Sequence, residues 1–265
     1  MNANAADAGR MLVRMEKERR VHMNEILTAL FARKSMRAYT KEPVSPEQKE
    51  LILKAACAAP TAGNQQLYTI LDITDQRIKD KLAVSCDNQP FIAEASMVLI
   101  FCADCQKWYD AFIAGGCEPR LPGVGDLMLA VTDCAIAAQN AVTAADSLGR
   151  GSCYIGDIME QCEFHRELLD LPGYVFPAVM LVIGVPTQQQ LERPKPERCD
   201  LKHIVHENAY RRMDAEELRE MLVPRAGRRP YGEWLKAFCD RKYQSDFARE
   251  MNRSVEEYLK AFRNE

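Results

Sequence analysis

The longest apolar segment of the chain, residues 126–148, is the feature that most constrains its fold. A helix with this sequence is apolar on nearly every side and, at about 1.5 Å per residue, spans roughly 34 Å, the width of a domain. A helix that is apolar all round must be buried. Polar residues within it, among them Asp133 and Gln139, argue against a membrane helix. We therefore predict a central core helix whose few polar groups are satisfied inside the fold or face a ligand or a partner subunit.

Predicted strands and helices alternate around this segment. A capping box at Ser45 and Gln48, with Pro46 at the first helical position, begins a helix that Pro60 ends. The other predicted elements are strands at 68–73, 96–101, 151–155 and 178–185, helices at 75–85 and 161–170, and a loop at 115–125. This order indicates an α/β or α+β fold rather than a helical bundle. No G-x-G-x-x-G motif follows a predicted strand, so the fingerprint of a Rossmann fold is missing.

The composition is that of a globular chain, with 265 residues of which 47% are hydrophobic and 28% charged, and a net charge of −3. This length suffices for one large domain or two small ones. The mildly acidic balance gives no reason to expect a nucleic acid partner, and no stretch reaches the roughly 20 uninterrupted apolar residues of a membrane span. The N-terminal residues lack the basic and apolar segments of a signal peptide, so we expect a cytoplasmic protein.

The ten cysteines are spread along the chain, and we expect reduced, buried thiols, Cys57, Cys134 and Cys239 among them. Cys102 and Cys105 form a C-x-x-C pair. Zinc normally needs a second such pair or two suitably spaced histidines, and the four histidines of this chain lie near no second pair. We predict no metal site, with a structural zinc or a redox dithiol as the alternatives.

Two short polar segments indicate a binding site. Residues 33–37 gather three cations and a hydroxyl, which are donors for a phosphate or another oxyanion. Residues 60–66 carry a hydroxyl and carboxamides, which can bind a flat ligand rich in heteroatoms. Together they suggest a pocket that holds a phosphorylated heterocycle at both ends. A solvated helix end and a plain turn are the alternatives.

The order of these segments resembles that of the FMN-dependent nitroreductase family, particularly its oxygen-insensitive NADPH nitroreductase branch. The matching segments are 33–39, 60–66, 147–156, 182–186, 195–198 and 204–208, and together they cover roughly residues 23–210. The resemblance implies an α+β fold of the nitroreductase type. In that fold a central mixed or antiparallel sheet is flanked by helices, and a long central helix lies at a homodimer interface.

The resemblance also divides the chain into three parts. Residues 1–22 would be an N-terminal extension, to which we assign no role, and residues 23–223 the FMN-binding domain. Residues 224–265 would be a C-terminal helical extension. Aromatic residues recur through it at helical intervals, among them Trp234, Tyr258 and Phe262. It is either an arm that wraps the other subunit or recognises the phosphate of the nicotinamide cofactor, or a pair of amphipathic surface helices.

The resemblance implies a role for each matched residue. Arg33, Lys34, Ser35 and Arg37 would contact the FMN phosphate and ribityl chain, with Arg198 closing on the phosphate. Lys195 is a further phosphate contact, although the family's basic-Pro-Arg triplet carries one inserted residue here. Pro60, Thr61, Asn64 and Gln66 would bind the ribityl chain and the ring edge from the partner subunit. Gln89 would line the flavin, and Tyr154, Ile155 and Gly156 would lie along one face of the ring, with a backbone N–H near Gly156 pointing at N5.

The implied function is that of an FMN-dependent NAD(P)H oxidoreductase. It would reduce nitroaromatics, quinones or similar electron-poor compounds by a ping-pong mechanism through flavin N5, with no catalytic side chain required. The alternatives on the same fold are a flavin reductase, an ene-reductase and a dehalogenase. A non-catalytic flavin-binding redox sensor and a metal-binding protein that uses the C-x-x-C pair are alternatives of other classes. The choice between NADPH and NADH stays open.

Overall fold

The computed structural model describes residues 23–263, and the chain divides into two compact units, residues 1–33 and 34–265. The predicted extension at residues 1–22 lies outside the described residues. In the first unit, α2 (Glu25–Ala32) begins after Asn24, whose side-chain oxygen accepts a hydrogen bond from the Leu27 amide at 2.9 Å. The second unit contains the sheet and all of the other described helices.

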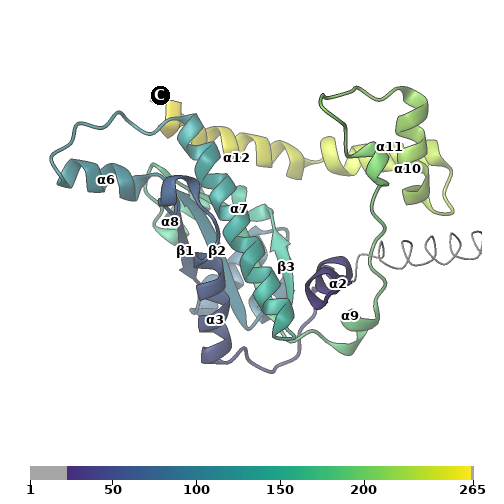
Figure 1. Cartoon of the computed structure of the whole chain (residues 1–265), viewed down its shortest axis with the longest axis horizontal. Helices are drawn as coiled ribbons and strands as arrows, with labels where there is room; N and C mark the ends of the chain where they lie inside the picture. Colours follow the sequence, from purple (N-terminus) through teal and green to yellow (C-terminus); the bar gives the residue numbers. More distant parts are fainter. Residues whose placement is uncertain (1–22, 264–265) are drawn as a thin grey trace, which may run out of the picture. The chain divides into compact units, whose positions relative to one another are not determined.

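A four-stranded sheet with the order β1-β2-β4-β3 forms the centre of the second unit (Figure 1). The strands are β1 (Tyr68–Asp72), β2 (Met97–Asp104), β3 (Gly151–Ile155) and β4 (Val175–Gly184), and every neighbouring pair is antiparallel. The predicted α+β class is therefore confirmed, with an antiparallel rather than a mixed sheet. The two central strands are almost wholly buried because they are continuous apolar runs covered on both faces.

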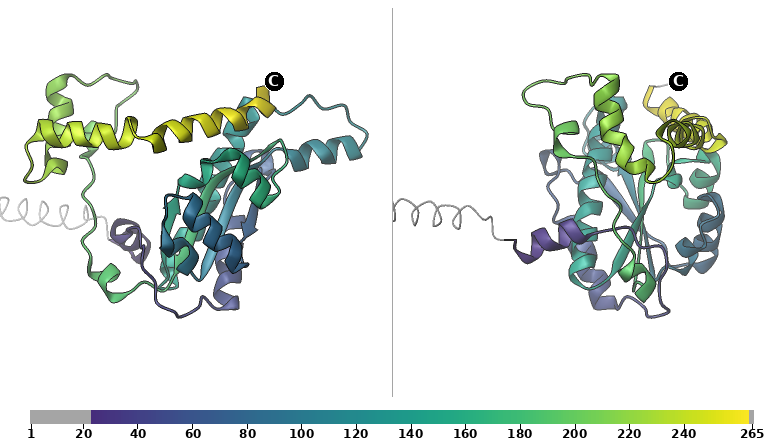
Figure 2. Two further views of the ribbon diagram at one scale, coloured as in Figure 1. Left: turned by 180° about the vertical axis from the view of Figure 1, so that it is seen from behind. Right: turned by 90° about the vertical axis from the view of Figure 1, so that its right-hand side faces the viewer.

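Helices cover both faces of this sheet (Figures 1 and 2). On one face, α7 (Val124–Ser147) and α3 (Pro46–Cys57) pack over side chains such as Leu99 and Leu181. On the other face, α4 (Gln76–Ser85) and α5 (Pro90–Glu94) pack over side chains such as Val98 and Val182. Neighbouring residues of one strand thus serve opposite cores, as the two-residue period of a strand requires.

The predicted central helix is α7, with 24 residues. It begins slightly earlier than its apolar run, because the Asp126 carboxylate accepts a hydrogen bond from the Gly123 amide at 2.8 Å and fixes the first turn. By length and composition α7 could cross a membrane. It packs instead against β2, β4 and α3, with small side chains such as Ala137 and Ala141 fully buried at the contact.

The C-terminal part of the chain is helical and joins the same core. It comprises α10 (Ala215–Ala226), α11 (Tyr231–Tyr243) and α12 (Asp246–Arg263). Ser254, Tyr258 and Phe262 recur every four residues along α12 and are all buried. The Tyr258 ring meets Phe176 of β4 edge-on, with centroids 5.0 Å apart. These contacts add the end of the chain to the main core, and its predicted role as a dimer-wrapping arm stays a prediction.

The remaining helices are α6 (Gln106–Ala114), α8 (Cys162–Leu169) and α9 (Gln188–Glu192). Three short 3₁₀ turns accompany them, η1 (Ala62–Asn64), η2 (Asp157–Met159) and η3 (Leu201–His203). The capping box at Ser45 and Gln48 is confirmed, with both reciprocal hydrogen bonds present. The predicted loop at 115–125 is shorter than expected and ends at Gly123, where α7 begins.

Candidate functional site

The segment that follows Arg33 crosses the edge of the sheet where β3 begins and β4 ends. The Met36 amide donates to the Ser152 carbonyl at 2.9 Å, and the Thr40 amide donates to the Val185 carbonyl at 2.8 Å. Two glycines make this crossing possible. A Cβ at Gly151 would lie 2.6 Å from Met36 Cγ, and one at Gly184 would lie 2.7 Å from Tyr39 Cδ1. Both distances are far below van der Waals contact, so the sheet admits the basic turn only where it lacks side chains.

The basic turn is held from the other side by the end of α9. Lys34 Nζ donates to the Leu191 carbonyl at 2.7 Å and also to the Arg193 carbonyl. The Arg37 amide donates to Gln190 Oε1 at 3.0 Å. Two of the predicted phosphate contacts, Lys34 and Arg37, therefore lie in one cluster with a stretch of chain more than 150 residues away.

Arg193 is a candidate site residue that the sequence analysis missed. Its Nη2 donates to the Ser35 carbonyl at 2.6 Å, while its Nε is buried and has no hydrogen-bond partner among residues 23–263. A buried guanidinium N–H without a hydrogen-bond partner can bind the acceptor oxygen of a ligand, and the strongest such acceptors are phosphate and carboxylate oxygens. The signal was present in the sequence, because Arg193-Pro194-Lys195 is a basic-Pro-basic triplet without an inserted residue.

The other predicted phosphate contacts lie in the neighbouring stretches of the chain. Arg198 is exposed, five residues beyond Arg193, and Lys195 is half-buried between them. Arg33 belongs to the first unit, so its part in the site stays a prediction. The donor set within the second unit nonetheless suits an anion, because Lys34, Arg37 and Arg193 lie together around one turn of backbone.

At the C-terminal end of β3, residues 154–156 form a surface that we call the floor. Ile155 is buried in the core, whereas Gly156 is exposed, and the nearest heavy atom to a Cβ placed on it would be Met159 Cε at 3.9 Å. Tyr154 is half-buried and its hydroxyl donates to Gln139 Oε1 of α7 at 3.2 Å. An accessible backbone at Gly156 leaves room for a flat ligand to lie close against the chain.

Gln89 lies next to this floor, and its contact with the flavin stays a prediction. Its Nε2 donates to Asp157 Oδ2 at 3.0 Å and to the Cys86 carbonyl at 2.8 Å. Glu160 follows on the same turn and is buried, and burial together with the nearby Asp157 and Asp87 charges raises its pKa to about 7. The floor and the basic turn lie at opposite ends of β3, roughly 13 Å apart at about 3.3 Å per residue. This geometry suits a long ligand with an anionic end and a flat end.

The loop at 60–66 is organised by a buried carboxylate. Asp133 of α7 accepts hydrogen bonds from the Thr61 hydroxyl, from the Ala62 amide at 3.2 Å and from the Leu67 amide at 3.2 Å. The Thr61 hydroxyl in turn accepts from the Gln66 amide at 2.8 Å. Asp133 is thus the satisfied polar group that the sequence analysis allowed for in the central helix.

This hydrogen-bonded frame presents the middle of the loop to solvent. Pro60, Asn64 and Gln66 are exposed. Asn64 and Gln66 adopt the left-handed backbone conformation, with φ of 56° and 49°. Gln66 Nε2 donates to the Cys57 carbonyl at 3.1 Å. Within one protomer this loop and the floor at Tyr154 lie on different sides of α7. Asp133 and Gln139 are six residues apart, which at 100° per residue places them about 120° apart around the helix.

The C-x-x-C pair lies away from these groups. Cys102 and Cys105 are buried, and burial, with the nearby Asp104 charge, raises the pKa of both thiols to about 12. Metal binding and dithiol chemistry both need the thiolate, which this environment disfavours. Among the described residues, no group of three potential metal ligands is present. The expectation of buried thiols is confirmed for Cys134 and wrong for Cys57 and Cys239, which are exposed because they lie on the outer faces of α3 and α11.

These features define an α+β protein with a cluster of cationic residues at one end of an edge strand of its sheet and an exposed glycine at the other. Residues 30–185 match the profile of the nitroreductase family, which is more than half of the chain. The chain belongs to the nitroreductase family.

The most similar relatives extend the match beyond that region. An FMN reductase [NAD(P)H] from Bacillus subtilis is 31% identical over 245 residues, covering 89% of this chain and 91% of the relative. An oxygen-insensitive NADPH nitroreductase from Salmonella typhimurium is 34% identical over 193 residues, covering 72% of this chain and 77% of the relative. Among solved structures, NfrA2 of B. megaterium has a TM-score of 0.76 at 30% identity, covering 89% of this chain and 98% of the other.

Proposed function

We propose that this protein transfers electrons from NAD(P)H through FMN to nitroaromatics, quinones and similar electron-poor compounds by a ping-pong mechanism. As a member of the nitroreductase family it is an oxidoreductase enzyme that uses FMN and NAD(P)H. The names of its relatives include a Cr(VI) reductase from Pseudomonas, 31% identical over 214 residues, which is consistent with a wide choice of acceptors. The observation that carries the proposal is the pairing of a cation cluster and an open floor at the two ends of β3.

The residues of this chain fit FMN. Lys34, Arg37 and the unpaired Nε of Arg193 would hold the phosphate, and Lys195 and Arg198 would add charge from the same stretch of chain. Arg33 and Ser35 complete the proposed set at this end. Tyr154, Ile155 and Gly156 would lie beneath the ring, with Gln89 beside it. When bound, FMN supplies the hydride chemistry, and the protein supplies position and electrostatics.

The cations also have an electrostatic role in the proposed function. Charge-assisted hydrogen bonds from these cations would stabilise the negative charge of the bound phosphate. Gly156 is exposed, and a backbone N–H near it would donate to a ring nitrogen lying over the floor.

We also propose a homodimer in which the loop at 60–66 serves the partner's flavin. Family members are typically dimers. Because the loop and the floor lie on different sides of α7 within one protomer, Thr61, Asn64 and Gln66 are better placed to meet a second copy. The exposed side chains of Met128 and Leu129 near the start of α7 supply apolar surface for such a contact. For this enzyme we propose a cytoplasmic location.

An absorption spectrum of the purified protein tests the proposal. Flavin bands that bleach on anaerobic addition of NADPH or NADH would support it and identify the donor. Flavin that stays oxidised with both donors would favour a binding or sensing protein. A colourless protein that cannot be reconstituted with FMN would overturn the proposal.

A flavin reductase is the second candidate. It is supported by the FMN reductase from B. subtilis, whose similarity covers 89% of this chain. Steady-state turnover with free FMN, a nitroarene, a quinone and a halogenated phenol separates the two candidates and also tests dehalogenase activity. A ratio of kcat/KM that favours free FMN at least tenfold over the nitroarene and the quinone would decide for the flavin reductase.

A further inference from the structure

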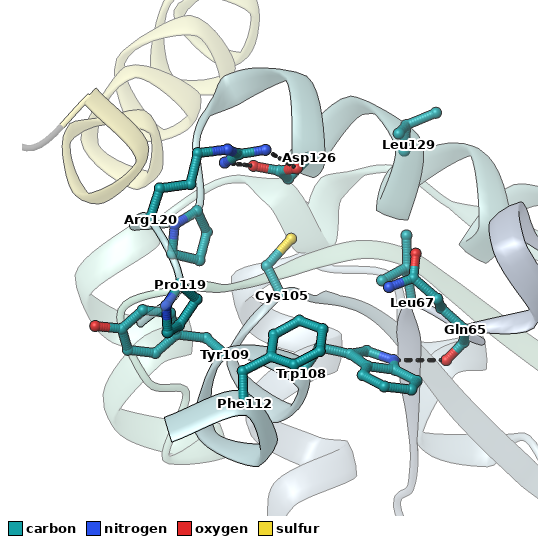
Figure 3. Close-up of a pocket in the computed structure, with 11 residues that line it drawn as sticks. Gln65, Leu67, Cys105, Trp108, Tyr109, Phe112, Pro119, Arg120, Asp126 and Leu129 are labelled. Carbon is teal, nitrogen blue, oxygen red and sulfur yellow. Dashed lines mark hydrogen bonds and ion pairs between the residues drawn. The ribbon is translucent and has the colours of Figure 1, made fainter. Parts of the chain in front are cut away.

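A pocket of about 300 Å³ opens between α6, the loop at 115–123 and the first turns of α7 (Figure 3). None of the residues that we place against the flavin phosphate or the floor lines it. Its walls come from three segments, and Gln65 and Leu67 close one end of it. The volume is at the lower limit for small-molecule sites, and it suits a ligand of one or two rings.

The pocket is walled by aromatic rings. Trp108, Tyr109 and Phe112 all line it from α6, with the Trp108 and Phe112 ring centroids 5.6 Å apart and tilted by 40°. Phe112 is 40% exposed, although full burial of so large an apolar side chain would stabilise the folded protein. In Figure 3 the Trp108 and Phe112 rings lie on the side of the pocket opposite the Arg120–Asp126 pair. An indole and a phenol are electron-rich rings, so they favour stacking with a flat, electron-poor arene.

The opposite wall is fixed by an ion pair. Arg120 donates from Nη1 to Asp126 Oδ2 at 2.5 Å and from Nη2 to Asp126 Oδ1 at 2.9 Å. The hydrogen bonds from Arg120 hold the pKa of Asp126 below its usual value. The same carboxylate caps the first turn of α7 through Gly123, so the pair ties the loop to the helix. The pocket is therefore a built feature of the fold rather than a gap beside a free loop.

A hydrogen bond connects the pocket to the loop that we place at the flavin. Trp108 Nε1 donates to the Gln65 carbonyl at 2.8 Å. Gln65 lies between Asn64 and Gln66, which are two of the proposed flavin contacts. A ligand stacked on Trp108 would therefore lie one residue away from the segment that contacts the flavin.

We propose that this aromatic pocket binds the planar, electron-poor arene that the enzyme reduces, beside the flavin of the partner subunit, which the loop at 60–66 contacts in the proposed homodimer. This inference rests on the proposed function, and it adds where the acceptor binds and which ring chemistry it needs. Trp108 and Phe112 are the residues that select flat acceptors. The reduction of small acceptors without an aromatic ring does not depend on the pocket.

A substitution with a matched control tests the inference in the holoenzyme. Phe112→Ala removes one wall, and Phe164→Ala on α8, also 40% exposed, removes an aromatic ring that does not line the pocket. We expect Phe112→Ala to raise KM for nitrobenzene at least tenfold, with turnover of ferricyanide unchanged. Phe164→Ala should leave both unchanged. A KM for nitrobenzene within twofold of the parent in Phe112→Ala would overturn the inference.

Tryptophan fluorescence gives a second measurement that needs no turnover. The chain has two tryptophans, Trp108 and Trp234, so the oxidised holoenzyme of Trp234→Phe reports on the pocket alone. Nitrobenzene should quench this emission along a saturating curve, and Phe112→Ala should raise the apparent Kd for nitrobenzene at least fivefold. Quenching that stays linear in nitrobenzene shows only collisions and contradicts the inference. Failure of the proposed function would appear elsewhere, as flavin that NADPH and NADH do not reduce.

Discussion

The guanidinium of Arg193 donates a hydrogen bond to the carbonyl oxygen of Ser35 at 2.6 Å, across 158 residues of sequence. Through this bond, and through those from Lys34 to the end of α9, two segments from opposite parts of the chain form one cation cluster. The first segment contributes Lys34 and Arg37 to this cluster, and the second contributes Arg193. The proposed flavin site therefore depends on this crossing as much as on any single cation.

Arg193→Ala should weaken FMN binding about 10- to 100-fold. A hydrogen bond to a charged group contributes about 1.5–3 kcal/mol, and this substitution also removes the bond to Ser35. Arg198→Ala should lower FMN retention as well, but by less, because Arg198 is exposed. Fluorescence titration of the apoproteins with FMN measures both. A fully retained flavin in the Arg198 variant would exclude that residue from the site, and an unchanged Kd in the Arg193 variant would contradict its assignment.

Gly184→Ala should destabilise the fold by about 1–3 kcal/mol, since the new methyl group would lie 2.7 Å from the buried ring of Tyr39. Displacement of the basic turn should also weaken FMN binding. Gly125→Ala is the matched control, because nothing lies within 4 Å of its Cβ position. Alanine within the first turn of α7 should be neutral or stabilise it by up to about 1 kcal/mol. Urea denaturation measures both, and equal midpoints for the two variants would contradict the clash.

Asp133→Asn should destabilise the protein by about 1–3 kcal/mol. The carboxylate accepts two hydrogen bonds from the loop at 60–66 and one from the adjoining Leu67 amide, and an amide cannot accept all three, so a buried donor would be left unpaired. Asp110→Asn is the control, because Asp110 is exposed and accepts from Gln106 on the surface of α6. Protease cleavage within the loop should become faster only in the Asp133 variant. A loop that resists cleavage equally in both variants would show that Asp133 does not hold it.

Glu160 should make the free energy of unfolding fall as pH rises from about 4.5 to about 7. Its pKa is raised to about 7 by burial and then by Asp157, Asp87 and Glu250, so the native state keeps a proton that the unfolded chain releases. This contribution is complete below the unfolded pKa and is lost as pH rises through the folded one. Denaturant titrations at pH 5 and pH 8 should show a smaller difference for Glu160→Gln than for the parent.

Glu163→Gln controls for this pH effect. Arg253 holds the pKa of Glu163 at about 2, so its contribution is present above the unfolded value and is lost only as pH falls towards 2. Between pH 5 and pH 8 the Glu163 variant should therefore keep the pH dependence of the parent. A parent whose stability does not change over this interval would refute the role of Glu160.

The sequence predicted the parts of the fold that local patterns determine. The two central strands, β2 and β4, are nearly continuous apolar runs and α7 is an apolar helix of unusual length, so composition along the chain located them. The short helix α9 was not predicted, because its five residues have no apolar period and its position is set by Lys34 and Gln190. The buried side of α12 became evident only with Tyr258 and Phe262 in the core.

The candidate site divides in the same way. Residues at the ends of β3 and in the loop at 60–66 belong to segments that the resemblance could match one by one. The contact between Arg193 and Ser35 could not be read from either segment, since it depends on how the chain returns across the sheet. The aromatic pocket could not be predicted because it depends on the ion pair between Arg120 and Asp126, which joins the loop at 115–123 to α7. No local sequence pattern predicts this pair.

The close approach of Tyr39 to Gly184 has a consequence for how this protein can change. A side chain at 184 has room only if the ring at 39 becomes smaller, while a smaller residue at 39 loses the hydrogen bond from the Tyr39 hydroxyl to the Met36 carbonyl. Mutations at the two positions should therefore be strongly epistatic, with each harmful alone and partly compensated together. At these two positions, beside the proposed phosphate end of the site, paired substitutions should therefore be tolerated better than single ones.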